Sequence, residues 1–271
     1  MTHTPPCPVK LGKESIAFWS LRPIGQLAVF VHGFRGSPTT TWVSFPQELL
    51  TGAGFGVDFL FYGYESLRQG AEESGVQLYD SLFKLWQSPA LIVNESLSSY
   101  PKRSTDFHYS RVTLIAHSLG AAVSRQAMIE HYRALNPWGT DIRLVLFAPA
   151  HKGANGAKLI GETLACGGII GSWIGAALEL QFQSIRDLKP ESQFLKSLVE
   201  ESRRAIISPE GLGAYITARK VIWVEADRVV INQRFLDDPK AERVEGRTHV
   251  SVCKPDAKYS KPVTEVMEAM S

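Results

Sequence analysis

The sequence is poor in cysteine, with three in 271 residues, and these lie far apart at Cys7, Cys166 and Cys253. An odd number without metal-ligand spacing argues against a disulfide framework and against a cysteine zinc site. The N-terminal segment MTHTPPCPVK also lacks the basic and then apolar pattern of a secretory signal peptide. Together these absences favour a cytoplasmic, reducing location.

Excess charge of one sign is missing as well, because 29 lysines and arginines nearly balance 27 aspartates and glutamates. The formal net charge is +2, and both signs are spread along the chain without a polybasic run. This pattern argues against nucleic acid as a partner. Partners must therefore be deduced from the motifs.

No hydrophobic run is long enough to span a membrane. Residues 163–178 are uncharged and rich in glycine and isoleucine, but their length of about 16 residues is short of the roughly 20 that a membrane span needs. We expect a buried or lid segment there, and a peripheral membrane contact through residues 169–178 stays open.

One stretch, residues 111–129 (RVTLIAHSLGAAVSRQAMI), joins three patterns that are typical of a nucleophile elbow. Residues 112–116 are expected to form a buried strand, and residues 117–120 (HSLG) a tight corner. The small residues after this corner are expected to form the start of a helix. The corner places Ser118 at a helix N-terminus, which helps to stabilise an oxyanion. Ser118 is therefore the predicted nucleophile.

The rest of the chain alternates strand-like apolar runs with helical segments. Such alternation predicts an α/β fold, with a mostly parallel central sheet flanked by helices and joined by right-handed crossovers. One domain over residues 1–271 is the simplest fit to this length. The predicted strands are residues 15–21 at an edge, then 26–31, 57–62, 112–116, 141–147 and 220–225. The predicted helices include residues 70–86, 188–201 and 263–270, with irregular segments at 1–13 and 88–109.

A serine hydroxyl is a poor nucleophile until a base accepts its proton, so an activated serine needs a histidine. After an elbow serine, the orienting acid and then the histidine follow in chain order. Of the three later histidines, His131 lies within the elbow helix and His151 closely follows the strand at 141–147. His249 alone lies in a late loop before the terminal helix, and it is the predicted base.

The acid that orients the base is predicted to be Asp227. It directly follows the strand at 220–225 and so lies at a carboxyl end, where clefts of open α/β sheets form. Glu225 is one alternative, because it shares that strand end. The pair Asp237 and Asp238 is another, although it is expected in a solvated loop beside a proline.

An oxyanion hole needs two backbone N–H groups. The first is assigned to Leu119, which follows the nucleophile. The second is assigned to Phe34, because Gly33 before it lets the backbone approach a ligand closely. For His32 a buried histidine that braces this loop is favoured over a substrate contact.

No cofactor or metal is expected. Gly52, Gly54 and Gly56 resemble a nucleotide-binding string, but they follow a helix and lead into a strand, which is the wrong context for a dinucleotide loop. No pair of histidines has the spacing of zinc ligands.

Six segments resemble the α/β-hydrolase superfamily, and within it the serine esterases related to GPI-inositol deacylases and bacterial lipases. They are VFVHGFRGSPTTTW (29–42), LIAHSLGA (114–121), LFAPAHKGA (146–154), RDLKPESQFLKSL (186–198), VEADRVV (224–230) and HVSVCKP (249–255). The resemblance implies a serine esterase or lipase with Ser118, Asp227 and His249 as its triad. Ala116 departs from the family pattern by replacing the first glycine of G-x-S-x-G.

Hydrolases of this fold insert lids between the strands at 141–147 and 220–225, so a lid or cap is expected at about 150–215. Trp173 and its apolar neighbours would suit an acyl-binding cleft, or they pack on the body of the protein. Trp173, His32, His117 and His151 are the candidate substrate contacts. An inserted Ala150 weakens the match at His151, for which a structural role is the alternative.

We therefore expect a serine hydrolase that cleaves carboxylic esters, small or lipid, through an acyl-enzyme intermediate. The same triad also permits acyl transfer or the cleavage of thioesters or amides, because it fixes the acyl-enzyme step and leaves the acceptor open. A hydrolase-fold protein that binds a ligand without turnover is the alternative of a different class.

Overall fold

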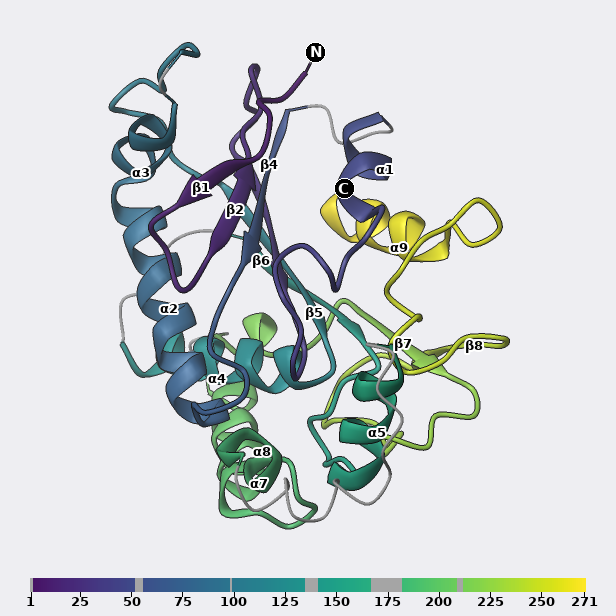
Figure 1. Ribbon diagram of the computed structural model, residues 1–271. Helices are drawn as coiled ribbons and strands as arrows, with labels where there is room; N and C mark the ends of the chain where they lie inside the picture. The colour runs from purple at the N-terminus through teal and green to yellow at the C-terminus, as the bar shows by residue number, and fades with distance from the viewer. Residues whose placement is uncertain (1, 52–55, 98, 135–140, 167–181, 209–211) are drawn as a thin grey trace.

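A single mostly parallel sheet runs through the computed structural model (Figure 1), which describes residues 2–51, 56–97, 99–134, 141–166, 182–208 and 212–271. Across these ranges the sheet has eight strands in the order β1-β2-β4-β3-β5-β6-β7-β8. The strands are β1 (Cys7–Val9), β2 (Ser15–Phe18), β3 (Gln26–Val31), β4 (Val57–Tyr62), β5 (Arg111–His117), β6 (Asp141–Phe147), β7 (Lys220–Val224) and β8 (Glu242–Val244).

The strands from β4 across to β8 are parallel to their neighbours, whereas β1 and β2 run antiparallel at one edge. The central strands are buried almost end to end, because helices cover both faces of a parallel sheet. Their carboxyl ends therefore lie at one edge of the sheet. The register pairs Val31 of β3 with Ala116 of β5, which brings the loop after β3 beside the corner after β5.

Helices lie on both sides of this sheet (Figure 1). On one side α4 packs against both α2 and α8, and it also contacts β3 and β5. On the other side α9 packs on β5 and β6 and contacts α1. The helices are α1 (Phe45–Thr51), α2 (Ala71–Gln87), α3 (Pro89–Ser96), α4 (Leu119–Arg133), α5 (Gly156–Cys166), α7 (Gln183–Asp187), α8 (Gln193–Ile206) and α9 (Lys261–Met270).

Helix α4 approaches the sheet closely because Gly120 has no side chain. A Cβ atom there would lie 2.4 Å from the carbonyl oxygen of Val31 and 2.5 Å from that of His32. Both neighbours are backbone atoms of the sheet and its loop, so neither can move aside cheaply. Glycine at this position therefore sets the depth at which the helix after the corner packs.

The expected α/β class with a mostly parallel sheet is confirmed, but the sheet contains two edge strands that were not predicted from the sequence. Residues 1–13 were expected to be irregular, and they contain β1, which pairs with β2. The other addition, β8, pairs with β7 at the opposite edge. Both are three residues long, and so short a strand leaves almost no periodic signal in the sequence.

Two helical expectations are corrected. The predicted helix at 188–201 begins later, at Gln193, because the Ser192 hydroxyl caps it by accepting the N–H of Leu195 at 3.2 Å. The segment 88–109, expected to be a polar loop with at most one helical turn, contains the two-turn helix α3. Pro89 at its first turn suits a helix start.

The residues expected to form a lid, about 150–215, include a range outside the described residues. Trp173 and most of the apolar segment at 163–178 fall there, and the lid therefore stays a prediction. The described parts are α5, α7, α8 and a 3-10 turn at Leu212–Tyr215. Within the described chain, no helix combines the length and apolar character that a membrane span requires.

Asp238 was expected in a solvated loop, and this is wrong. Its side chain is only 2% exposed and pairs with the fully buried guanidinium of Arg125 on α4. Its second oxygen accepts the backbone N–H of Ala218 at 2.9 Å. The Arg125 guanidinium also lies over the Phe235 ring, 4.1 Å from the centroid. Asp238 thus ties α4 to the segment before β7 and has no contact with His249.

Removing one partner of this buried pair is expected to destabilise the protein strongly. Arg125→Met should lower the free energy of unfolding by about 3–5 kcal/mol, because the Asp238 carboxylate would stay buried without its cation. The matched control is Arg133→Met on the same helix, where a partly exposed pair with Glu130 should contribute less than about 1 kcal/mol. Urea unfolding measures both, and equal losses in the two variants would contradict the assignment.

Candidate active site

Ser118 occupies the corner between β5 and α4 in a backbone conformation that is rare for a residue with a side chain. Its φ is 54° and its ψ is −119°. Hydrogen bonds hold this strained corner in place, since the Ser118 N–H donates to Phe147 O at 3.0 Å and the Ser118 carbonyl accepts the N–H of Ala150 at 3.1 Å. The serine side chain therefore projects from a rigid turn at the carboxyl edge of the sheet.

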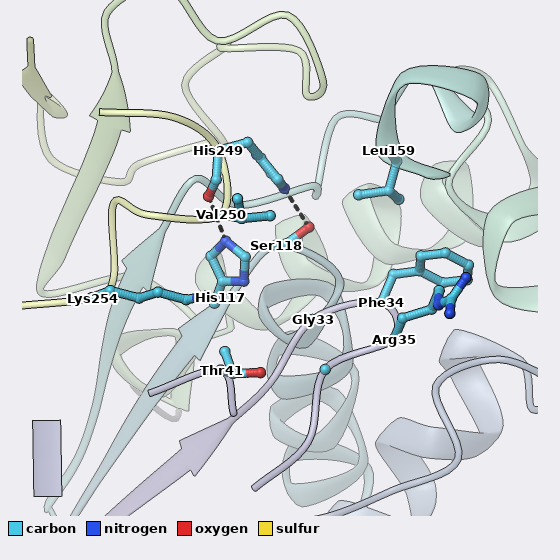
Figure 2. Close-up of a pocket in the computed structure, with 11 residues that line it drawn as sticks. Gly33, Phe34, Arg35, Thr41, His117, Ser118, Leu159, His249, Val250 and Lys254 are labelled. Atoms are coloured by element: carbon cyan, nitrogen blue, oxygen red, sulfur yellow. Dashed lines mark hydrogen bonds between the residues drawn. The ribbon is translucent and has the colours of Figure 1, made fainter. Parts of the chain in front are cut away.

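A continuous chain of hydrogen bonds leads away from this serine. The Ser118 hydroxyl lies 2.8 Å from His249 Nε2, a contact drawn in Figure 2. His249 Nδ1 in turn lies 3.0 Å from Asp227 Oδ2. The other carboxylate oxygen of Asp227 accepts the backbone N–H groups of Val229 at 2.8 Å and Val230 at 3.2 Å. The side chains of His249 and Asp227 are fully buried.

Asp227 is held as a carboxylate by its partners. Burial alone would raise its pKa, but the hydrogen bond and charge of His249 and the two backbone donors lower the pKa below its usual value. An ionised Asp227 accepts the Nδ1 proton of His249, so Nε2 is left bare to accept the serine proton. The arrangement is thus able to generate an alkoxide-like nucleophile at Ser118.

The two predicted oxyanion donors flank this serine. Beyond Gly33 the chain turns back on itself, with the Gly36 N–H donating to Gly33 O at 3.0 Å. Within the described chain, no acceptor engages the N–H of Phe34. The N–H of Leu119 lies in the first turn of α4, where a helix offers no internal acceptor. Both amides therefore remain available to a ligand oxygen.

Gly33 is required at this point because the loop passes very close to the elbow. A Cβ on Gly33 would lie 2.9 Å from Ser118 Cβ and 3.1 Å from His117 Nδ1. A side chain here would push the loop away from the serine. The glycine therefore lets the Phe34 backbone come near the reacting position.

His117 joins the elbow to the loop that carries His249. Its Nε2–H donates to the backbone carbonyl of His249 at 2.8 Å, and the two rings lie 5.1 Å apart (Figure 2). Burial, with the charge of His249 as a smaller cause, lowers the pKa of His117 to about 3, so this imidazole is neutral at physiological pH. His117 also lines the cavity in front of Ser118.

The other candidate substrate contacts lie elsewhere. His32 is buried behind the loop that carries Phe34, where its ring stacks on Tyr64 with centroids 4.4 Å apart and its Nδ1 lies 2.9 Å from Gly33 O. Burial lowers its pKa to about 4. These contacts match the bracing role. His151 is also buried, beside Phe235 and 3.4 Å from Gln233 O, and lines a separate surface pocket. Trp173 is outside the described residues.

Figure 2 shows the side chains that line the cavity in front of Ser118. Its volume is about 100 Å³. The sequence did not single out six of its lining residues, namely Arg35, Gly36, Thr41, Leu159, Val250 and Lys254. Arg35 and Lys254 lie inside the motifs around His32 and His249, so their proximity to predicted site residues was the available signal. Leu159, on α5, carried no such signal. In the described ranges, no cluster of three or more His, Cys, Asp or Glu side chains is arranged to hold a metal.

No family model matches this sequence, and no curated protein matches it. Solved structures do match over nearly the whole chain. A lipase of Bacillus licheniformis in its mature form is 18% identical, with 97% of this chain and 96% of that chain covered and a TM-score of 0.56. A peroxisomal α/β-hydrolase of Saccharomyces cerevisiae is 11% identical, with 98% and 86% covered and a TM-score of 0.56. This chain has the α/β-hydrolase fold.

A third α/β-hydrolase-fold match is a carboxyl esterase of the fungus Tuber melanosporum, 16% identical, with 98% of this chain and 84% of that chain covered and a TM-score of 0.58. The expected fold class is confirmed by these matches. At such low identities they show the fold alone. The activity of this α/β-hydrolase-fold protein has to be argued from its own site.

Proposed function

We propose that this protein is a serine hydrolase that cleaves carboxylic esters through an acyl-enzyme intermediate. One observation carries the proposal, namely the hydrogen-bonded chain from Asp227 through His249 to Ser118, with distances of 3.0 and 2.8 Å, at the strained corner of an α/β-hydrolase fold. A nucleophile, a base and an orienting acid are thereby combined in the chain order that elbow hydrolases use.

In the acylation step Ser118 Oγ attacks the ester carbonyl carbon while His249 Nε2 accepts the hydroxyl proton. The carbonyl oxygen becomes an oxyanion, and the N–H groups of Phe34 and Leu119 donate to it. Collapse of the tetrahedral intermediate expels the alcohol, which takes the proton from His249. Asp227 stabilises the transient imidazolium and keeps the ring oriented.

In the deacylation step water attacks the acyl-enzyme, and His249 accepts a proton from it. The same oxyanion donors stabilise the second tetrahedral intermediate, whose collapse releases the carboxylic acid and returns the proton to Ser118. Apart from the ester and water, these two steps use only groups of this chain. The printed names of the structural neighbours, a lipase and a carboxyl esterase, agree with ester cleavage by this fold.

Covalent labelling tests the identity of the nucleophile directly. A fluorophosphonate probe should modify Ser118 alone in the folded protein, because only an activated serine attacks phosphorus at a useful rate. Peptide mass spectrometry locates the adduct, and urea-unfolded protein, in which the hydrogen-bonded chain is lost, is the control. Modification of a different serine, or equal labelling of folded and unfolded protein, would refute the proposed function.

A further inference from the structure

Two cationic side chains border the cavity in front of Ser118, and among the described residues neither has a partner of opposite charge. Arg35 follows the proposed oxyanion donor Phe34, and Lys254 lies on the loop that carries His249. Figure 2 shows them on opposite sides of Ser118. Within the described chain, neither side chain makes a hydrogen bond or an ion pair, whereas cations elsewhere, such as Arg103, Arg111 and Lys220, each contact a carboxylate.

No carboxylate among the described lining residues offsets these two charges. Asp227 lies behind His249 and is already committed to it. Glu162 on α5 is near Asp227 and His249 but is not among the lining residues, and burial raises the pKa of its carboxyl. His117, which does line the cavity, is neutral. The described wall of the cavity is therefore cationic on two sides of the nucleophile.

Lys254 differs from a freely solvated surface lysine in its exposure and in its contact with the site. Its side chain is only partly exposed, and its charge contributes, after burial and His249, to the lowered pKa of the His117 imidazole. Arg35 is exposed at the opposite wall, where its backbone has a positive φ of 54°. The conformation is uncommon for a residue with a side chain, and such strain is concentrated at ligand sites.

We propose that the cavity selects esters carrying an anionic oxygen group, a carboxylate or a phosphate, a few bonds from the scissile carbonyl. Arg35 and Lys254 would bind that group while Ser118 attacks. The inference rests on the proposed ester hydrolysis and narrows its substrate class. A volume of about 100 Å³ keeps any group inside the cavity close to both walls. Among protein side chains, the guanidinium group of arginine and the ammonium group of lysine are the best suited to bind the oxygens of a carboxylate or a phosphate.

The test compares pairs of esters that differ in charge and little in size. On the acyl side, p-nitrophenyl hemisuccinate is compared with p-nitrophenyl butyrate, so that a carboxylate replaces a terminal methyl. On the alcohol side, butyryl-glycerol 3-phosphate is compared with butyryl-glycerol. At low salt we expect kcat/KM to be about tenfold higher for the anionic member of at least one pair, because one charge-assisted hydrogen bond contributes a factor of about this size. The pair that responds tells on which side of the ester the anion lies.

Two variants assign the effect to the proposed residues. Arg35→Gln and Lys254→Gln should each lower kcat/KM for the preferred anionic ester by about threefold to tenfold and change that for its neutral counterpart less than twofold. The matched control is Lys258→Gln, on the same loop as Lys254 but exposed and outside the lining of the cavity. It should preserve the preference. Because salt screens partly exposed charges, the ratio of kcat/KM for the anionic ester to that for the neutral ester should fall as the salt concentration rises from about 10 to about 500 mM.

Failure of this inference differs from failure of the proposed function. Turnover of the neutral esters with no preference for an anion in either pair would overturn the inference and leave ester hydrolysis standing. A preference that survives in both variants would also overturn it, since other groups would then bind the anion. No turnover of any ester, together with no fluorophosphonate labelling of Ser118, would overturn both.

Discussion

Ser118→Ala should lower kcat for p-nitrophenyl butyrate by about 10⁴-fold or more. The loss is large because the variant keeps the oxyanion donors but has no atom to form the acyl-enzyme. Structure should be preserved, since the described contacts of the serine hydroxyl are confined to His249 Nε2 at 2.8 Å and alanine retains the Cβ at this corner. The measurement is steady-state hydrolysis, with thermal unfolding to verify the fold.

The control for this variant is another buried serine, on the helix that follows the corner. Ser124 lies in α4 and its hydroxyl has no hydrogen-bond partner among the described residues, so Ser124→Ala should keep kcat within about twofold and leave stability nearly unchanged. If Ser118→Ala retained the wild-type rate, the acyl-enzyme mechanism would be wrong. If both variants lost activity equally, the effect would come from packing of α4 and not from the nucleophile.

The elbow could be predicted from the sequence because its signal is local. A buried strand, a corner of small residues and a helix follow one another within residues 111–129, and each part has its own pattern. The acid and base were assigned by chain order, and the structure brings Asp227 and His249 to Ser118 across more than a hundred residues of sequence. What chain order could not provide is the register of β3 with β5, which brings Gly33 beside the elbow.

Other features depended on pairing between distant segments and left no local trace. Asp238, placed among residues typical of a solvated loop, is buried only because α4 presents Arg125 to it. Leu159 reaches the cavity because the start of α5 is bonded to the loop after Asp227, with the Asn155 N–H donating to Val229 O at 2.7 Å. Short sequence windows do not encode such contacts, so the sequence did not predict that Leu159 lines the cavity, whereas it did predict the strand, corner and helix around Ser118.

Asp227→Asn is expected to lower kcat by about 10⁴-fold while leaving KM nearly unchanged. The asparagine amide would donate to His249 Nδ1 and so favour the tautomer with a proton on Nε2. That nitrogen then faces Ser118 with a hydrogen and cannot accept the serine proton. Fluorophosphonate labelling should slow in parallel, because it requires the same activation of the hydroxyl.

The matched control is Glu225→Gln, two residues earlier at the end of the same strand. Glu225 was the alternative acid, and its side chain is exposed, whereas the Asp227 side chain is fully buried against His249. The control should keep kcat within about twofold, because surface substitutions away from a hydrogen-bonded network have small effects. A larger loss in Glu225→Gln than in Asp227→Asn would reassign the acid. Equal and small losses in both would mean that His249 is oriented by its backbone contact with His117 instead of by a carboxylate.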